Sequence, residues 1–299
     1  MKTRMKEYWD KLEAEYENKY KENIFKNYEQ TVPVFEEFRK FLNELLSRYP
    51  TNVDIICTLA SVELELGYQE TAIKLLEDFI LKYKDVINDV DKARIYTNLG
   101  FYYKADKKQD EYLLKAEKLN SPFLETYKGL ALTYFSNYEY NKATEDLCKS
   151  LNYFEKALKI TNDYEIHFGY AICLFEAKQY QKAKEIFEDL LIKYPNRMRL
   201  LLSISYCEAY LGNKERALHY LKQVKVNQDE NYYLTTDDIH DFQIFEVYYF
   251  LEEYDLFLEE CEKVIESFYF ADWNHYFYTL WLKNESEKFN KYIDKYKNE

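Results

Sequence analysis

Residues 164–197 read YEIHFGYAICLFEAKQYQKAKEIFEDLLIKYPNR, two apolar segments separated by a short polar turn. The same pattern starts again thirty-four residues later, in MRLLLSISYCEAYLGNKERALHYLKQVKVN. Ser205 then stands where Ala171 stands in the first copy, and Ala217 corresponds to Ala183. Self-similarity at a fixed period of this length is typical of stacked helix pairs. The sequence therefore predicts a helical repeat protein.

This pattern resembles the tetratricopeptide repeat family, in which small residues lie where two helices approach most closely. Ala171 occupies the small-residue position of the first helix, Tyr180 opens the second helix, and Pro195 ends it. A bulky group at such a position would overpack the contact, which typically costs about 1 to 3 kcal/mol. Recurrence of small residues is therefore what this packing requires.

The resemblance extends upstream of the two best copies. Residues 52–83, NVDIICTLASVELELGYQETAIKLLEDFILKY, place Ala60, Gly67 and Ala72 at matching positions. Two further repeats fit loosely: one has a shortened second helix, and the next runs about six residues beyond the usual period of 34. We expect these departures to bend or re-register the stack locally.

The resemblance implies an all-α fold, a right-handed α-solenoid of antiparallel helix pairs. The expected organisation is one superhelical domain over residues 1–299, with an N-terminal helical pair at 1–50, tetratricopeptide-like repeats at 51–90, 91–123, 124–163, 164–197 and 198–231, a degenerate acidic repeat at 237–270, and capping helices at 271–299. A polar last helix suits the cap of such a stack.

The composition suits long helices joined by short turns. The 299 residues include only 5 Gly and 4 Pro, too few to form the many tight turns of a sheet protein or to supply a flexible linker. Hydrophobic residues make up 47% and charged residues 32%, which provides both a core and solvated helix faces. The 33 Tyr and 20 Phe suit a thin, two-layer architecture, because tyrosine can bury its ring while its hydroxyl stays wet.

The sequence predicts a cytoplasmic protein that does not enter the membrane. The N-terminal stretch MKTRMKEYWDKLEAEYENKY has no apolar run like that of a secretion signal, and nowhere do eighteen uncharged apolar residues occur together. The cysteines are odd in number and far apart, so we expect reduced core residues rather than disulfides or metal ligands. They are Cys57, Cys148, Cys173, Cys207 and Cys261.

Motifs for catalysis, metal binding or cofactor binding are missing from the sequence. The five glycines lie too far apart for a phosphate-binding loop, and the four histidines never pair at metal-ligand spacing. One cluster combines Thr235, Thr236, Asp237, Asp238, His240 and Asp241. Hydroxyl and carboxylate side chains are common at a helix start, where they accept bonds from free N–H groups and offset the dipole. We therefore expect no enzyme, no metal and no cofactor.

Acidic residues concentrate near the C-terminal end. The formal net charge is −13, yet residues 229–272 contain fourteen acids and a single base, Lys263. The predicted acidic patch comprises Asp237, Asp238, Asp241, Glu252, Glu253, Asp255, Glu259 and Glu262. Solvated helix faces often carry glutamate, so a structural role is one explanation, and contact with a basic partner is the other. Nucleic acid is not expected to bind this region.

The family resemblance also implies an interaction surface. Tetratricopeptide proteins usually hold their ligand in a concave groove lined by the first helix of each pair. That register selects Phe101, Lys128, Phe135, Phe168, Phe175, Arg199, Tyr206, Tyr210, Phe242 and Tyr249. The Lys and Asn pattern with which chaperone-binding relatives hold a terminal carboxylate is missing, and Lys128 is the only comparable residue. An apolar or aromatic-tolerant peptide or helix is therefore the expected ligand.

Three functional classes remain, of which an enzyme is the least favoured because no catalytic constellation supports it, so two lead. The first is a bacterial, cytosolic scaffold or regulator that captures a peptide or protein in the groove, an architecture that resembles peptide-responsive bacterial regulators. Residues 1–30 do not form the helix-turn-helix that would make the chain a direct transcription factor. The alternative is an immunity protein or inhibitor that masks a basic toxin or effector with the acidic region. The partner is a protein or peptide in both cases.

Overall fold

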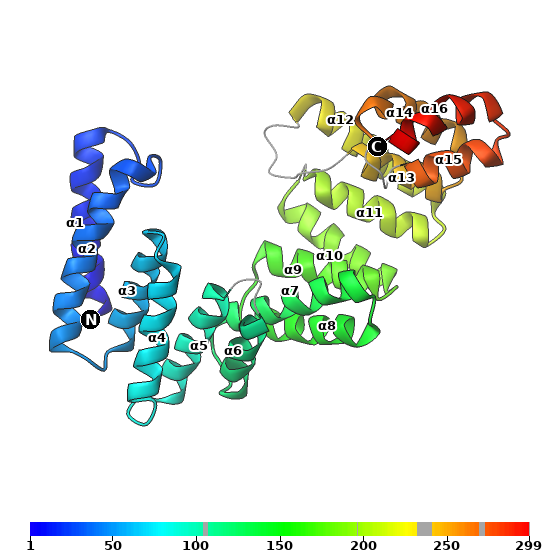
Figure 1. The fold of residues 1–299 in the computed structure, drawn as a ribbon. Helices are drawn as coiled ribbons and strands as arrows, with labels where there is room; N and C mark the ends of the chain where they lie inside the picture. The colour runs from blue at the N-terminus through cyan, green and yellow to red at the C-terminus, as the bar shows by residue number, and fades with distance from the viewer. Residues whose placement is uncertain (104–106, 196, 232–240, 269–272, 299) are drawn as a thin grey trace. The chain divides into compact units, whose positions relative to one another are not determined.

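The computed structural model describes residues 1–103, 107–195, 197–231, 241–268 and 273–298. Every regular element within these ranges is helical, which confirms the predicted all-α fold class (Figure 1). The helices fall into two compact units, unit 1 over Met1–Thr161 and unit 2 over Asn162–Glu299. The division of the chain into the expected repeats stays a prediction.

Unit 1 contains the first eight helices of Figure 1. They are α1 (Lys2–Tyr20), α2 (Tyr28–Arg48), α3 (Val53–Glu65), α4 (Gln69–Tyr83), α5 (Asp89–Tyr102), α6 (Lys107–Lys118), α7 (Leu124–Asn141) and α8 (Thr144–Leu158). The repeat that is too long for the period owes its length to α7, which has 18 residues where α9 has 13.

Unit 2 contains the remaining helices. They are α9 (Tyr164–Glu176), α10 (Tyr180–Lys193), α11 (Met198–Tyr210), α12 (Lys214–Asn231), α13 (Asp241–Phe250), α14 (Tyr254–Val264), α15 (Trp273–Leu282) and α16 (Ser286–Asn298), with a short 3₁₀ turn η1 (Ile265–Ser267) after α14. Inside each unit, every helix packs on the next one along the chain. Contact with sequence neighbours is how stacked repeats bury their apolar faces.

Side-chain caps start three of the first helices of pairs. Asn52 accepts a bond from the amide of Ile55 at 3.1 Å at the start of α3, and Asn88 does the same for Asp91 at 2.9 Å at the start of α5. Asp163 caps α9 in the same way. Such caps satisfy amides that have no partner within the helix, so they fix where each first helix begins.

The turns between the two helices of a pair share one backbone conformation. Each described turn of this kind contains a residue in the left-handed region, where only glycine avoids a steric penalty. The residues are Lys21 (φ 58°), Gly67 (φ 83°), Lys142 (φ 56°), Lys178 (φ 60°), Gly212 (φ 80°), Glu252 (φ 59°) and Asn284 (φ 57°). The reversal of chain direction therefore requires a positive φ even where the sequence does not supply glycine.

Small residues lie at the helix contacts, as the repeat pattern predicts. Ala171, Ala183, Ser205 and Ala217 are all fully buried. The Ser205 hydroxyl donates to the carbonyl oxygen of Ala217 at 2.8 Å, which ties α11 to α12. A hydroxyl at this position is therefore tolerated because its polar group has a buried partner.

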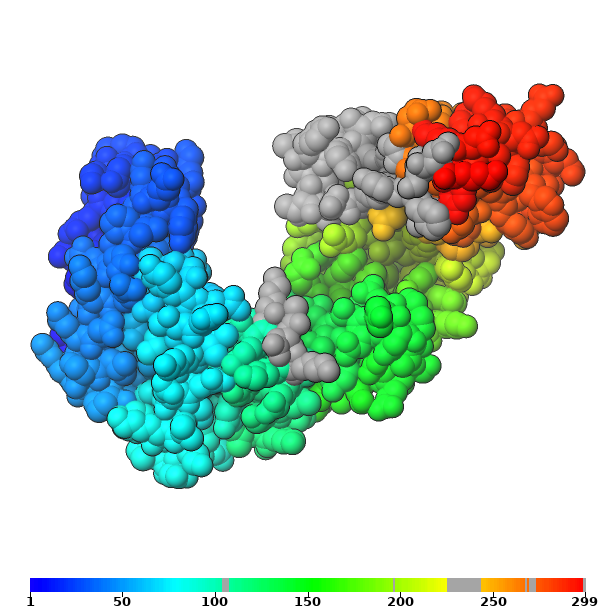
Figure 2. Space-filling view, viewed as in Figure 1, coloured from blue at the N-terminus to red at the C-terminus, as the bar shows by residue number. Residues whose placement is uncertain are grey.

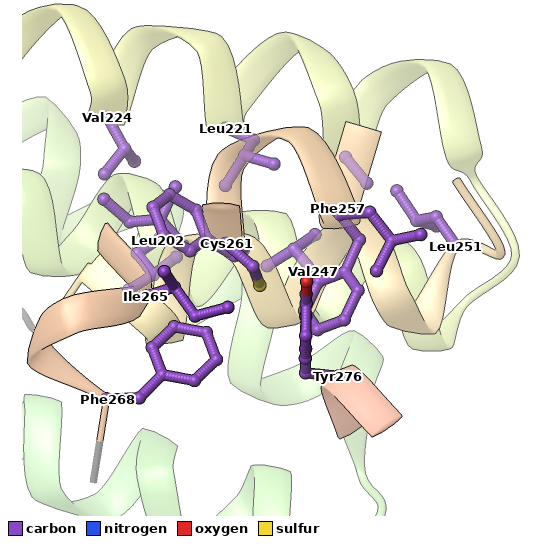
Figure 3. Packing of buried hydrophobic residues seen from close by; sticks show 14 of the residues in the cluster. Leu202, Leu221, Val224, Val247, Leu251, Phe257, Cys261, Ile265, Phe268 and Tyr276 are labelled. Carbon is purple, nitrogen blue, oxygen red and sulfur yellow. The ribbon is translucent and has the colours of Figure 1, made fainter. Parts of the chain in front are cut away.

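The core of unit 2 is built from larger side chains toward its C-terminal end. Phe257 occupies the place of alanine in the better repeats and is fully buried, and so is Trp273. Figure 3 shows Cys261, Phe257 and Tyr276 turned toward a shared interior. The degenerate repeat thus keeps a packed core by exchanging small residues for aromatic ones.

Close packing holds in both units. In the space-filling view, side chains fill the gaps that the ribbon leaves between neighbouring helices of a unit (Figure 2). Four cysteines are buried, but Cys148 on α8 is exposed, so the expectation of five core cysteines is wrong at this position. Cys148 follows Leu147, which is buried, and its side chain therefore leaves the helix on a different face.

Candidate functional site

The first helices of unit 2 form an open cavity of about 360 Å³. α9, α11 and α13 supply nearly all of its walls, and four of the residues predicted for the groove line it together. The lining residues are Phe168, Ile172, Phe175, Glu176, Phe187, Arg199, Leu202, Ser203, Tyr206, Gln243 and Glu246. Residues three and four apart share a helix face, so the sequence spacing of these positions aims them at one side of the unit.

Aromatic rings extend the cavity across the surface. The ring of Phe175 contacts the ring of Tyr210 edge-on, with 5.3 Å between the ring centroids. Tyr210 in turn stacks on Tyr180, with 4.8 Å between their centroids. Phe250 on α13 lies 5.5 Å from Tyr210 and contacts Tyr249. Tyr210 and Phe250 are 44% and 38% exposed. The cavity together with Tyr210, Tyr249 and Phe250 is called the aromatic groove below.

Tyr206 ties α11 to α13 at the centre of this groove. Its hydroxyl lies 2.9 Å from Glu246 Oε2 and 2.7 Å from the carbonyl oxygen of Gln243. Burial raises the pKa of Tyr206, and the negative charge of Glu246 and the bond to it raise the pKa further. Tyr206 therefore stays neutral at physiological pH. Its hydroxyl links α11 to α13, and its ring lines the cavity.

Arg199 covers the opposite end of the cavity. Its guanidinium lies over the ring of Phe168, 5.4 Å from the ring centroid. Phe168 is only 9% exposed, so it supports the groove from below while Arg199 forms the surface above it. An arginine stacked in this way keeps its charge at the rim while its planar face stays packed.

The other predicted groove residues lie in different surroundings. Tyr249 lies at the edge of the aromatic groove, where its ring centroid is 4.3 Å from that of His275 on α15. Lys128 and Phe135 are half-buried on α7 in unit 1, where the ring of Phe135 contacts Tyr138 at 6.2 Å. The side chain of Phe242 lies outside the described residues. A single groove containing all ten predicted residues stays a prediction.

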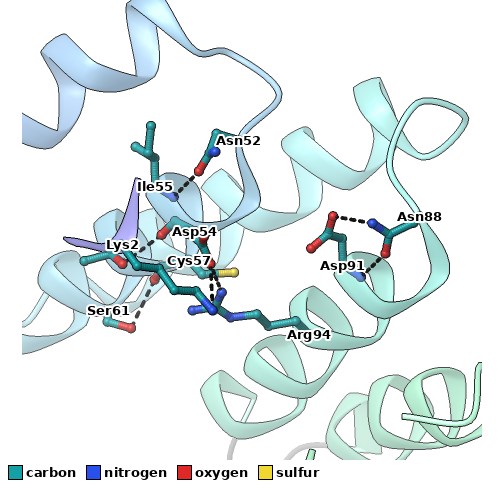
Figure 4. A network of polar contacts seen from close by, with 10 residues as sticks. Lys2, Asn52, Asp54, Ile55, Cys57, Ser61, Asn88, Asp91 and Arg94 are labelled. Atoms are coloured by element: carbon teal, nitrogen blue, oxygen red, sulfur yellow. Dashed lines mark hydrogen bonds and ion pairs between the residues drawn. The ribbon is translucent and has the colours of Figure 1, made fainter. Parts of the chain in front are cut away.

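Phe101 lines a separate, more polar cavity in unit 1. This cavity of about 720 Å³ also includes Asp54, Arg94 and Asn98. Arg94 pairs with Asp54, and Lys2 approaches the same carboxylate at 3.5 Å (Figure 4). Our sequence analysis missed these residues. Asp54, Arg94 and Arg199 each lie six residues before the small residue of their first helix, so the repeat register was the signal that could have found them.

The described acids of the predicted acidic patch are paired largely with lysines. Asp255 Oδ1 lies 2.8 Å from Lys283 Nζ, and Glu262 Oε1 lies 2.7 Å from Lys288 Nζ. Within the patch, Glu253 also pairs with Lys214 and Glu259 with Lys263; outside it, Glu260 pairs with Lys263 and Glu266 with Lys295. Glu252 is exposed in the turn before α14. Asp237 and Asp238 lie outside the described residues, as does the side chain of Asp241.

A buried ion pair recurs in the two units. Glu208 is fully buried on α11 and accepts from Lys184 of α10 at 3.3 Å and from Arg216 at 2.9 Å. Glu63 in unit 1 pairs with Arg39 at 3.4 Å. Both pairs span twenty-four residues and join a second helix to the next first helix. A buried charge is tolerated only with such partners, so these residues hold the stack rather than a ligand.

Two searches of the described part of the chain gave negative findings. No group of three His, Cys, Asp or Glu side chains lies close enough to hold a metal ion within the ranges that the structure describes. Among the same residues, no helix is long and apolar enough to cross a membrane.

Comparison with known proteins places the fold in a class. YrrB, a tetratricopeptide repeat protein with an unusual peptide-binding site, has a solved structure that is 16% identical, with 64% of this chain and 94% of YrrB covered and a TM-score of 0.53. A tetratricopeptide repeat protein from Parabacteroides merdae is 13% identical; the alignment covers 88% of this chain and 94% of that protein, with a TM-score of 0.47. MamA from AMB-1 is 17% identical; the alignment covers 60% of this chain and 92% of MamA, with a TM-score of 0.48. The chain is a helical-repeat solenoid, as the sequence predicts.

Part of the chain matches a family model. Residues 134–204 match the family model of the tetratricopeptide repeat. A sequence search of curated proteins gave no match. The matched residues include Phe168, Phe175 and Arg199 of the aromatic groove. The match shows a tetratricopeptide repeat within residues 134–204, and the remainder of the chain shares the helical-repeat fold.

Proposed function

We propose that this chain is a non-catalytic scaffold or regulator that captures a peptide or protein in the aromatic groove of unit 2. The bacterial and cytosolic setting expected from the sequence belongs to the same proposal. The fold class alone supports a role in protein–protein interaction, since stacked repeats create extended binding surfaces. The groove adds the place where the partner would bind.

One observation carries the proposal. Phe168, Phe175, Arg199 and Tyr206 line one open cavity, and the exposed rings of Tyr210 and Phe250 continue from it. Exposed aromatic side chains beside a cavity are the usual anchors of a protein interface, because they bury much area at little entropic cost. The similarity to YrrB supports the same proposal at the level of fold, since YrrB has a peptide-binding site.

Affinity capture with matched variants tests this function. We expect replacement of Tyr210 and Phe250 by alanine to weaken partner capture by about tenfold or more, since interface anchors often contribute about 2 kcal/mol. Ile192→Ala is the control, because Ile192 is 79% exposed on α10 and is not among the residues that line the cavity. Equal capture by both variants and the natural chain would refute a groove-based function, provided that their helical spectra agree.

The alternative function, masking of a basic partner by the acidic region, has less support. Six described carboxylates between residues 253 and 266 have a lysine within ion-pair distance. Such pairs reduce the local negative field, although each adds little stability at an exposed site. A masking function would show association that slows strongly as salt rises, whereas a groove dominated by aromatic contacts would show a weaker dependence.

A further inference from the structure

Two carboxylates lie beside the aromatic rings of the unit 2 cavity. Glu176 is the last residue of α9, Glu246 lies on α13, and both line the cavity with Phe175 and Tyr206. We propose, on the basis of the function proposed above, that this cavity selects an extended peptide by one basic side chain, a lysine or an arginine. The basic group would lie between the ring faces and the two carboxylates.

The carboxylates are placed to receive a cation. Glu246 already accepts from the Tyr206 hydroxyl at 2.9 Å, and its other oxygen lies 3.6 Å from Nδ1 of His275. An ionised carboxylate has about four acceptor positions, so an ammonium or guanidinium group can bind beside these partners. Such charge-assisted bonds are roughly twice as strong as neutral ones.

The aromatic rings of the groove would also attract the basic side chain. A cation within about 6 Å of a ring centroid is attracted by the negative face of the ring, and more strongly where water is excluded. Burial raises the pKa of Tyr210, and the nearby Tyr180, Glu246 and Glu176 raise it further. The two carboxylates therefore act on the same aromatic surface that would cover the peptide.

Arg199 lines the cavity but lies at its other end. It precedes Tyr206 by seven residues, which is about 10 Å along a helix axis. Its guanidinium rests on Phe168, while Tyr206 meets Phe175, seven residues further along α9. The positive charge of Arg199 is thus about two turns from the proposed cation site.

The size of the cavity favours an extended segment as its occupant. About 360 Å³ is near the lower end of the usual range for ligand pockets. An extended peptide is narrower than a helix, which is about 10 to 12 Å across with its side chains. An extended peptide points alternate side chains to one face, so a single basic side chain can enter while its neighbours lie on the exposed rings.

Selection from a random peptide library displayed on phage, with the full chain as target, tests the proposal. We expect enriched peptides to carry a lysine or arginine next to apolar or aromatic residues. For a synthetic peptide of the enriched sequence, the double variant Glu176→Gln, Glu246→Gln should lower affinity by about tenfold or more. Glu185→Gln is the matched control, because Glu185 is exposed on α10 and does not line the cavity, and it should leave the affinity unchanged.

Two results would overturn the proposal in different ways. If the enriched peptides lack a basic residue and bind the double glutamine variant equally well, the basic-side-chain inference is wrong, while the groove function survives as long as Tyr210→Ala removes binding. If no peptide is enriched, or binding is indifferent to Tyr210→Ala, both proposals fail. Circular dichroism of each variant shows whether the fold is intact.

Discussion

At the scale of single residues, burial decides which thiols can react. Burial raises the pKa of Cys57 and of Cys207 to about 12, and Cys173 and Cys261 are also buried. The thiolate is the reactive form, so these four should resist alkylation at pH 8 in the folded chain. Cys148 is exposed and should react. Mass spectrometry should find one label on the native protein and five after denaturation; several labels on the native protein would contradict this burial.

Gly100 shows how closely two helices approach. A Cβ atom added there would lie 2.6 Å from Cγ of the buried Leu113 on α6. We expect Gly100→Ala to lower the free energy of unfolding by about 1 to 3 kcal/mol, measured by urea denaturation. Leu113→Ala is also destabilising by itself, but the double variant should lose less than the sum, because the shortened side chain makes room. Additive losses would show that the two positions do not touch.

Residue-level prediction from sequence succeeds where packing repeats and fails where distant charges meet. Ala171 and Ala183 could be placed because their size recurs with the repeat. The ion pair of Lys184 with Glu208 could not, because charged residues are common on solvated helix faces and only tertiary contact shows that these two are buried. Cys148 was misassigned because an apolar segment does not say which helix face leaves the core.

At the scale of elements, the turn between α9 and α10 contains a residue with an unfavourable backbone conformation. Lys178 has a φ of 60°, a conformation that costs a non-glycine residue about 1 to 2 kcal/mol. Gly212 occupies the equivalent turn between α11 and α12 without that cost. We expect Lys178→Gly to stabilise the chain by about 0.5 to 1 kcal/mol, after the larger entropy of glycine in the unfolded state is subtracted.

Thermal denaturation followed by circular dichroism measures this change. Gly212→Ala is the reciprocal variant, since it introduces a Cβ atom at φ 80° where no neighbour lies within 4 Å, and it should lower the melting temperature. Because no side-chain clash contributes, the loss reports backbone strain alone. A lower melting temperature for Lys178→Gly would mean that the lysine side chain contributes more than the strain costs.

Element boundaries followed from the sequence wherever a cap or a repeat marked them. Asn52 and Tyr180 lie at the starts of helices that the pattern predicts. The extra length of the loose repeat could be seen in the sequence, but its assignment to α7 could not, because the polar residues near Asn141 fit a turn as well as a helix end. Helix packing decided between them.

At the scale of the whole molecule, the acidic region illustrates the limit of composition. Residues 229–272 contain one base, yet lysines of α12, of α16 and of the turn after α15 lie beside their carboxylates. A charge count along the chain cannot show this, because folding brings distant segments together. The groove is the converse case, since its predicted positions follow the repeat register and four of them, three aromatic residues and Arg199, meet in one cavity.

Site-specific photo-crosslinking tests the central claim, partner capture in the aromatic groove, most directly. A photoreactive phenylalanine analogue replaces Tyr210 in the groove or, as a control, Ile192 on α10, and the chain is irradiated in an extract of its host. Both side chains are exposed, so either can reach a bound protein. We predict a discrete cross-linked adduct from position 210 and none from position 192. Adducts from position 192 alone, or equal adducts from both, would contradict a partner held in the groove.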